Sequence, residues 1–258
     1  MEILVHPDKL DMDVIIPIIR DAWSLPEMGE EPKYLLGPMS KELGLDHLLI
    51  GAYKADEELV GFLIGTDAKK KKDEMHLYLL GVRKDYQNGG IGCALLEAFR
   101  DEALKKGKKR LSWTFDPFDT HCAHLYFRKV DGICTEYRME QLYMTEPTCR
   151  DDFPGRFFRV DWNLEEKNPY KETNRDYALR HLHRVVLPKE EHDEFLIEIS
   201  PMFQLRMHLI HRVAFMEFKR LDGLFEHYIN ERGYSVVDFL YERREKKGFY
   251  KLKQNLYC

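Results

Sequence analysis

The stretch from Leu77 to Arg100 constrains the fold more than any other part of the sequence. It opens with an apolar run, Leu77–Val82, continues through a polar, glycine-rich turn, and then repeats apolar residues three and four positions apart. This pattern predicts a strand, a tight turn and a helix in direct succession. Backbone N–H groups at a helix start lack intrahelical partners, and the helix dipole adds positive potential there. The turn is therefore suited to holding a phosphate or pyrophosphate.

The segments around this stretch predict a mixed sheet. Upstream, we expect an edge strand at Met1–His6, a helix over Met12–Trp23 with Val14, Ile15, Ile18, Ile19 and Ala22 on its buried side, and a hairpin of His47–Lys54 and Glu58–Thr66. Downstream, we expect a strand at Arg110–Phe115, a short helix over His121–Val130 and a strand at Ile133–Leu142. The fold class is α/β (α+β), with a mostly antiparallel sheet flanked by helices. Ser24–Leu45, rich in Pro and Gly, is a candidate lid or substrate loop.

The remainder of the chain gives weaker signals. After a connection at Tyr143–Phe153, we expect strands at Arg156–Asn163, Val185–Leu187 and Glu194–Ile199, the longest helix over Phe203–Glu231 with an apolar stripe of Leu205, Leu209, Val213, Met216, Leu221, Leu224 and Tyr228, and a hairpin of Tyr234–Tyr241 and Gly248–Lys253. The predicted domains are residues 1–145 and a smaller α+β unit, 146–258, built on the long helix. This unit closes the acceptor side of a site, forms a dimer contact, or is a degenerate copy of the first half.

Composition excludes several classes of function. The net charge of −5, with 33% charged residues, argues against general nucleic-acid binding. No apolar run is long enough to cross a bilayer, and we expect no signal peptide. The five cysteines are scattered without a C-x-x-C pair or zinc-ligand spacing. We therefore expect free thiols in a reducing cytoplasm, no metal site and no membrane partner.

The segment from Val82 to Cys93, V-R-K-D-Y-Q-N-G-G-I-G-C, resembles the acyl-CoA-binding signature of the GCN5-related N-acetyltransferase (GNAT) superfamily. Gln87, Gly90 and Gly92 occupy the motif positions, and the spacing from Val82 fits. No Gly-Lys-Ser/Thr of a P-loop and no G-x-G-x-x-G of a dinucleotide-binding fold is present. The resemblance covers roughly the first 145 residues. It implies that an acyl-CoA is the co-substrate and that these residues contact it: Leu80, Gly81, Val82, Arg83, Gln87, Asn88, Gly89, Gly90, Ile91, Gly92, Cys93 and Cys122.

The resemblance also implies how the donor lies. The pantetheine arm would pair with the backbone at the end of the Leu77–Val82 strand, in a gap where the Leu111–Phe115 strand splays away. Backbone N–H groups from Gln87 to Cys93 would hold the pyrophosphate. A backbone N–H near Val82 would stabilise the developing oxyanion.

A narrower resemblance extends over most of the chain. The segments Ser112–Pro117, Ala123-His124, Pro154–Phe157 and Gly233–Phe239 are similar to those of a two-part bacterial and archaeal GNAT subfamily. Some of its relatives are associated with N-acylamino-acid racemases. This likeness implies transfer of an acyl group, such as succinyl, to an amino acid.

The proton-transfer groups are less clearly marked. In the family, the helix after the splayed strand often reads N-A-x-x-x-Y, whereas here Cys122 replaces the Asn and Phe127 the Tyr. Solvent, another residue or the adjacent Tyr126 would then protonate the leaving thiolate. Glu74 is the first candidate for the base and His76 the second, since both lie on the strand entering the motif. The alternative is that both belong to a solvated strand start.

Candidates for holding the acceptor are Asp116, His124 and Arg212. Asp116 follows the strand beside the thioester, and Arg212 could bind a carboxylate with two hydrogen bonds. The alternatives are a turn before Pro117 for Asp116, local packing for His124 and a salt bridge for Arg212.

Together these features predict an acyl-CoA-dependent N-acyltransferase. It would move an acetyl or succinyl group to a primary amine, such as that of an amino acid or another small molecule, by direct attack. The alternatives are a non-catalytic CoA-binding regulatory protein and a protein or peptide N-acetyltransferase. A homodimer is compatible with all three.

Overall fold

The computed structural model describes residues 1–5, 12–23, 47–55, 57–68, 71–139, 155–188, 191–203 and 209–254. The chain forms two compact units, Met1–Trp113 and Thr114–Cys258, which are described separately. The candidate loop Ser24–Leu45 and the connection Tyr143–Phe153 lie outside the described residues. The functional boundary expected near residue 145 stays a prediction.

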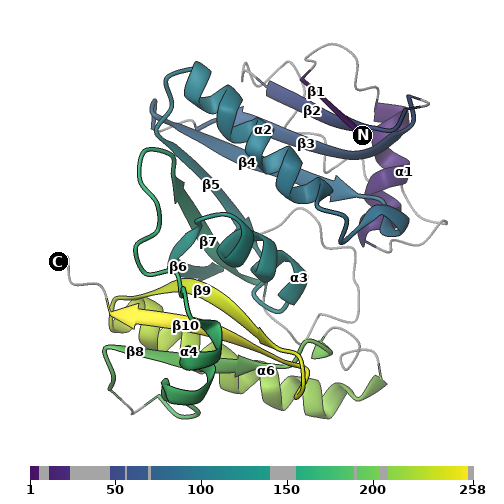
Figure 1. Cartoon of the computed structure of the whole chain (residues 1–258). Helices are drawn as coiled ribbons and strands as arrows, with labels where there is room; N and C mark the ends of the chain where they lie inside the picture. Colours follow the sequence, from purple (N-terminus) through teal and green to yellow (C-terminus); the bar gives the residue numbers. More distant parts are fainter. Residues whose placement is uncertain are drawn as a thin grey trace. The chain divides into compact units, whose positions relative to one another are not determined.

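The first unit is built on a sheet in the order β1-β2-β3-β4-β5 (Figure 1). Its strands are β1 (Glu2–Val5), β2 (His47–Tyr53), β3 (Leu59–Asp67), β4 (Glu74–Val82) and β5 (Arg110–Phe115), of which β5 continues into the second unit. Neighbours pair antiparallel from β1 to β4, whereas β4 and β5 pair parallel. The predicted mixed, mostly antiparallel sheet is confirmed.

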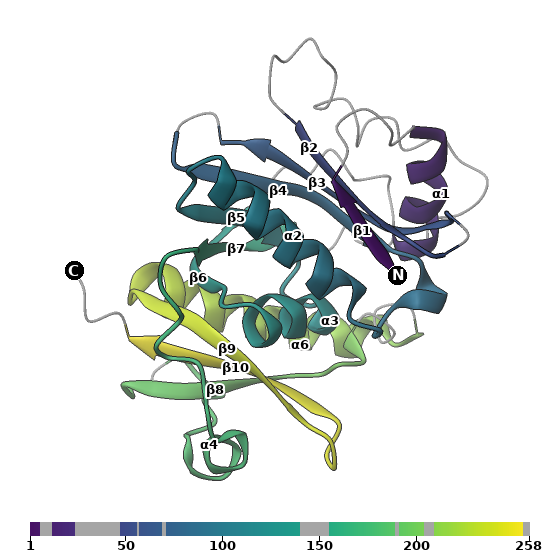
Figure 2. The same cartoon turned by 45° about the horizontal axis from the view of Figure 1, so that its top comes forward.

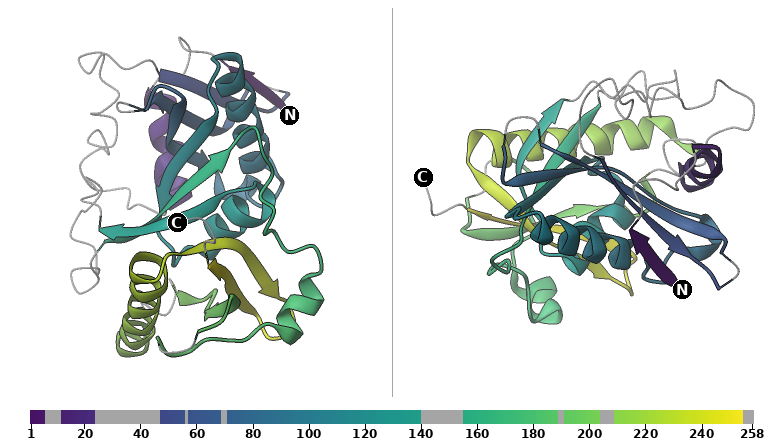
Figure 3. Two further views of the ribbon diagram at one scale, coloured as in Figure 1. Left: turned by 90° about the vertical axis from the view of Figure 1, so that its left-hand side faces the viewer. Right: turned by 90° about the horizontal axis from the view of Figure 1, so that it is seen from above.

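Two helices cover opposite faces of this sheet, α1 (Met12–Trp23) and α2 (Ile91–Lys105) (Figure 3). Helix α2 buries the apolar residues that recur along one of its sides, namely Ile91, Leu95, Leu96, Phe99 and Ala103. In α1 the three isoleucines predicted as buried are buried, but Val14 is exposed. The prediction for Val14 was wrong because this position lies at the margin of the apolar stripe, beyond the part that contacts the sheet.

Gly65 in β3 lets α2 approach the sheet closely. A Cβ atom at Gly65 would overlap the ring of Phe99, which is fully buried. We expect Gly65→Ala to lower the free energy of unfolding by about 1–3 kcal/mol, because a close-packed core accommodates an added methyl group only by distortion. Chemical denaturation measures this change. In the matched control Gly223→Ala, where a Cβ would meet nothing within 4 Å, stability should stay level or rise; equal effects at both sites would contradict the packing argument.

The second unit has a sheet in the order β7-β6-β9-β10-β8, and the pairs within it are antiparallel. The strands are β6 (Ile133–Met139), β7 (Arg156–Asn163), β8 (Glu194–Ile199), β9 (Tyr234–Glu242) and β10 (Lys247–Gln254). Figure 2 shows the β9–β10 hairpin with β8 beside it. The predicted C-terminal hairpin is confirmed.

Helices surround this second sheet. They are α3 (Thr120–Ala123), the π-helix η5 (His124–Lys129), α4 (Arg175–His181), α6 (His211–Phe225) and the π-helix η6 (Glu226–Glu231) that continues α6. Helices α4 and α6 lie on opposite faces of β8–β10 (Figure 3). Phe158 of β7 is central to an aromatic core, with ring centroids 4.8–6.3 Å from those of Phe225, Tyr250, Tyr137 and Phe127.

One strand predicted for the second half was wrong, and one helix was missed. Val185–Leu187 is not a strand, because only an isolated bridge between Arg184 and Leu196 forms there. Helix α4 was not predicted; its start is capped by Asn174, whose side chain accepts a hydrogen bond from the N–H of Tyr177.

The stripe predicted for the long helix is only partly correct. Leu221, Leu224 and Tyr228 are buried, whereas Leu209, Val213 and Met216 are exposed. The buried face instead continues toward the N-terminus through Phe218 and Ala214. Near the start of this helix, apolar residues lie on two different sides, and their spacing in the sequence does not determine which side is buried.

Candidate active site

The glycine-rich turn connects β4 to α2, as predicted. After Val82 the chain forms a short 3₁₀ turn, Lys84–Tyr86, and then an exposed segment, Gln87–Gly90, before α2 begins at Ile91. The side-chain amide of Gln87 donates a hydrogen bond to the carbonyl of Val82, 2.9 Å away, and so closes the turn on itself. This contact gives the motif glutamine a structural role at the end of β4.

Backbone conformation explains two residues of the turn. Gly90 caps α2 with φ of 87°, and Asn88 has φ of 62°, so both occupy the left-handed region that Gly and Asn adopt most easily. A Cβ at Gly90 would meet nothing within 4 Å, so its conformation and not local crowding favours glycine. The first backbone N–H groups of α2, at Ile91, Gly92 and Cys93, have the orientation that binds anions at helix starts.

Three other residues that are predicted to contact CoA, Gly81, Arg83 and Cys93, also make contacts within the protein itself. A Cβ at Gly81 would meet the Phe62 ring at 2.7 Å, so packing within the sheet already favours glycine there. Arg83 forms an ion pair with Glu58, which also pairs with Lys54 at 3.0 Å. The Lys54 partner contributes most to a lowered pKa of Glu58. The Cys93 thiol lies 3.8 Å from the Glu97 carboxylate one turn along α2.

Strand β4 departs from its neighbour β5 after a short contact. The two strands pair only over Glu74–His76 and Arg110–Ser112. On its other side, β4 pairs with β3 through a register shift that leaves Tyr78 as an extra residue. A bulge of this kind bends a strand and increases its twist. The backbone of Leu80–Val82 is therefore not occupied by pairing with β5, which fits the predicted place for a pantetheine arm.

Three side chains form a hydrogen-bonded chain where β4 and β5 still pair. The Ser112 hydroxyl lies 2.6 Å from Glu74 Oε1 and 3.2 Å from His76 Nδ1. Glu74 is 3% exposed and Ser112 fully buried, whereas His76 is partly exposed. Lys71 Nζ lies 3.1 Å from Glu74 Oε2. Both predicted base candidates are thus brought together, but through a serine that the sequence analysis did not single out.

In the second unit, Cys122 and Tyr126 lie together at the α3–η5 junction. Burial raises the pKa of the Tyr126 hydroxyl well above its usual value, and the neighbouring Cys122 and Asp119 add to the effect. Burial likewise raises the pKa of the Cys122 thiol. Both groups therefore keep their protons at neutral pH. Phe127, in the position where the family has its tyrosine, is fully buried in the aromatic core.

The predicted acceptor residues have local partners or are exposed. Asp116 Oδ1 accepts a hydrogen bond from the N–H of Phe118 at 2.8 Å, which is the turn-forming role weighed as its alternative. Burial lowers the pKa of His124, the first residue of η5. Arg212 is exposed on α6. Roles of these residues in binding an acceptor stay predictions.

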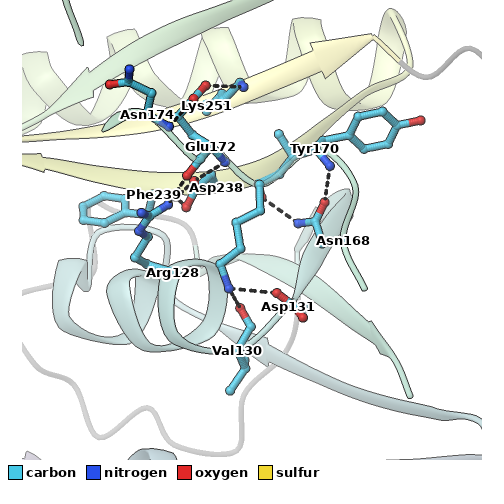
Figure 4. Close-up of polar contacts among 12 residues, drawn as sticks. Arg128, Val130, Asp131, Asn168, Tyr170, Glu172, Asn174, Asp238, Phe239 and Lys251 are labelled. Carbon is cyan, nitrogen blue, oxygen red and sulfur yellow. Dashed lines mark hydrogen bonds and ion pairs between the residues drawn. The ribbon is translucent and has the colours of Figure 1, made fainter. Parts of the chain in front are cut away.

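A buried polar network that the sequence did not reveal ties η5 to the C-terminal strands (Figure 4). Asp238 of β9 is fully buried and accepts hydrogen bonds from Arg128 at 2.8 Å, from the N–H of Glu172 at 2.9 Å and from the N–H of Phe239 at 2.8 Å. Lys251 pairs with Glu172 at 3.0 Å. The only signal in the sequence is an aspartate inside the apolar strand pattern V-V-D-F-L.

Within the described ranges, no helix is both long and apolar enough to span a bilayer. The same part of the chain holds no cluster of three or more His, Cys, Asp or Glu side chains that could bind a metal ion.

Comparison with known protein families gives a match that covers the region that contains the turn. Residues 14–131, just under half of the chain, match the model of the acetyltransferase (GNAT) family. No curated protein sequence matches the chain.

Three solved structures illustrate what the fold is similar to. The ribosomal-protein-S18-alanine N-acetyltransferase from Escherichia coli is 19% identical, with 63% of this chain and 94% of that chain covered and a TM-score of 0.47. The PaiA N-acetyltransferase from Thermoplasma acidophilum, in complex with coenzyme A, is 19% identical, with 63% and 99% covered and a TM-score of 0.43. The IAA acetyltransferase from Bacillus cereus ATCC 14579 is 13% identical, with 63% and 99% covered and a TM-score of 0.46.

Proposed function

We propose, from the match of residues 14–131 to the acetyltransferase (GNAT) family, that this protein transfers an acyl group from acyl-CoA to the nitrogen of a small primary amine. The match to this family supports an acyltransferase activity. The acyl-CoA supplies an acyl group activated as a thioester. An amino acid acceptor and a succinyl donor are the finer proposal, which rests on the likeness to the racemase-associated subfamily.

The observation that carries this proposal is the junction of β4, the turn and α2. Leu80–Val82 lies beyond the pairing with β5, and the turn that follows presents the first N–H groups of α2 beside a left-handed Gly90. An extended amide-containing arm can pair with such a backbone edge, and a pyrophosphate can bind such a helix start. The two features follow each other directly in the chain, as recognition of one CoA molecule requires.

The proton transfers are assigned to named groups. The attacking amine must be neutral, and a base from the Glu74–Ser112–His76 group accepts its proton, directly or through water. A backbone N–H near Val82 stabilises the oxyanion. Tyr126 is the proposed proton donor to the leaving thiolate, because its hydroxyl is protonated at neutral pH and it lies next to the position where the family has its tyrosine. Asp116, His124 and Arg212 are proposed to hold the acceptor.

An assay of thiol release tests the proposal. The purified chain is supplied with acetyl-CoA or succinyl-CoA and a panel of amino acids, polyamines and peptides, and CoA affinity is measured in parallel. We expect amine-dependent release of CoA with at least one amino acid. Tight CoA binding without turnover on any amine would favour the non-catalytic alternative, and turnover on peptides alone would favour a peptide N-acetyltransferase.

Glu74→Gln separates catalysis from donor binding. We expect kcat to fall about 100-fold, the lower end of what general base assistance typically contributes. The dissociation constant of CoA should not change, since Glu74 lies at the opposite end of β4 from the turn. Steady-state kinetics and calorimetry measure the two quantities. Glu102→Gln on α2, which removes a surface ion pair with Lys105, is the matched control and should leave both unchanged; full activity of Glu74→Gln would remove Glu74 from the mechanism.

A further inference from the structure

The Ser112 hydroxyl has two neighbours but only one proton to donate. It lies 2.6 Å from Glu74 Oε1 and 3.2 Å from His76 Nδ1. An ionised carboxylate can only accept hydrogen bonds, whereas a hydroxyl donates one and can accept others. The ion pair between Lys71 and Glu74, at 3.1 Å, stabilises the ionised carboxylate in this buried position. The serine proton is therefore directed to Glu74.

This direction of donation determines where the proton of the neutral imidazole sits. Since Ser112 Oγ uses its proton on Glu74, it faces His76 Nδ1 with a lone pair, and Nδ1 must carry the hydrogen atom that completes the contact. Nε2 then holds the lone pair of the ring. The hydrogen bond made by one ring nitrogen thus sets the state of the other.

The strand register holds this arrangement in place. His76 and Ser112 are direct partners in the parallel pairing of β4 and β5, and Glu74 lies two residues before His76, so its side chain is on the same face. Ser112 is fully buried and Glu74 is 3% exposed, which limits both to few rotamers, while His76 is partly exposed. Of the three, His76 alone is open to solvent.

We propose that Glu74 and Ser112 are positioning residues that hold His76 in the Nδ1–H tautomer, and that Nε2 of His76 is the base that accepts the proton of the amine. This inference rests on the proposed acyltransferase function and reverses the order of the two base candidates. Glu74 acts through the serine and does not itself contact the acceptor.

The variant Glu74→Gln offers a specific test of this arrangement. The Lys71 ammonium attracts an amide oxygen and repels an NH₂, so the oxygen of the new side-chain amide should face Lys71 and its NH₂ should face Ser112. The amide would donate to Ser112 Oγ, and the hydroxyl would turn its proton toward His76 Nδ1. The imidazole would then adopt the Nε2–H tautomer and lose the basic nitrogen. Ser112→Ala removes the constraint altogether, and Ser112→Thr keeps a hydroxyl at the same position.

The tautomer is read by long-range ¹H–¹⁵N correlation spectroscopy on the full chain with ¹⁵N-labelled histidine, with the His76 signals assigned by His76→Gln. We expect Nδ1–H in the unaltered protein and in Ser112→Thr, Nε2–H in Glu74→Gln, and a loss of the Nδ1–H preference in Ser112→Ala. Glu74→Gln and Ser112→Ala should lower kcat about 100-fold, the lower end of what general base assistance typically contributes, with KM for acyl-CoA unchanged.

Matched controls exclude general effects of the substitutions. Ser235→Ala removes another buried strand hydroxyl, and His181→Gln removes an exposed histidine on α4; both should leave the His76 tautomer and kcat unchanged. An Nε2–H tautomer in the unaltered protein, or the same tautomer in Glu74→Gln as in the unaltered protein, would overturn the inference. The expected tautomers in a protein that acylates no amine would overturn the proposed function instead. If Ser112→Ala does not fold, the His76 tautomer measured in Glu74→Gln is sufficient to test the inference.

Discussion

Replacing Gly92 by Glu is expected to weaken CoA binding at least about 100-fold, equivalent to about 2.7 kcal/mol, while the protein stays folded. Gly92 is the second residue of α2, where the first N–H groups are proposed to bind the pyrophosphate. A carboxylate in the first turn of a helix interacts favourably with the helix dipole, and glycine is a poor helix former. The fold therefore loses little, whereas an anionic ligand meets a like charge in its own site.

Binding calorimetry with CoA and thermal denaturation measure the two effects. Gly92→Ala separates the charge from the added side chain and should weaken binding much less. Gly223→Glu on α6 introduces the same residue at an exposed helical glycine in the second unit, where a Cβ meets nothing within 4 Å, and should leave CoA affinity unchanged. Undiminished binding by Gly92→Glu in a folded protein would refute the assignment of the turn.

Asp238→Asn is expected to lower the free energy of unfolding by about 3 kcal/mol. The Asp238 carboxylate accepts from three donors, Arg128 and two backbone N–H groups, and has no exposed surface. An amide of the same shape places an NH₂ against one of these donors whichever way it is turned. Breaking a buried ion pair on one side typically costs about 3–5 kcal/mol, and Arg128, 27% exposed, recovers part of this from water.

Chemical denaturation measures this loss. The matched control is Asp161→Asn in β7, which makes the same change in a pair with Arg159 where the Asp161 side chain is 25% exposed. It should cost clearly less than Asp238→Asn, since the Asp161 carboxylate stays in contact with water, whereas Asp238 has no exposed surface, and ion pairs contribute less as they become more hydrated. If both variants lose the same free energy of unfolding, the burial of Asp238 does not determine how much its carboxylate stabilises the protein.

Local signals in the sequence were sufficient to predict the strand, turn and helix of the proposed donor site. The strand, turn and helix around Gln87–Gly92 each follow from residues a few positions apart, and the bounds of α1 and β5 agree with their predictions. The left-handed backbone conformation of Gly90 at the start of α2 is likewise a local property, because glycine adopts positive φ angles readily.

Contacts between distant residues set the limit of what could be predicted. The role of Ser112 depends on the register between β4 and β5, and the bulge at Tyr78 shifts which residues share a face of β4. Neither the register between two strands nor a bulge can be predicted from the alternation of apolar and polar residues within one strand. The exposed Leu209, Val213 and Met216 show the same limit in a helix, because an apolar stripe does not state which side a sheet will cover.

The network around Asp238 also bears on where this protein can be divided. The match to the acetyltransferase family ends at residue 131, yet Arg128 inside the match binds Asp238, and Phe127 packs against Phe158 and Tyr250. A chain that ended at residue 131 would lack Asp238, which pairs with the Arg128 guanidinium, and the two rings that pack against Phe127. The end of the family match therefore falls inside the second compact unit, Thr114–Cys258, and a truncation there would separate the helix that carries Tyr126 from the strands it packs against.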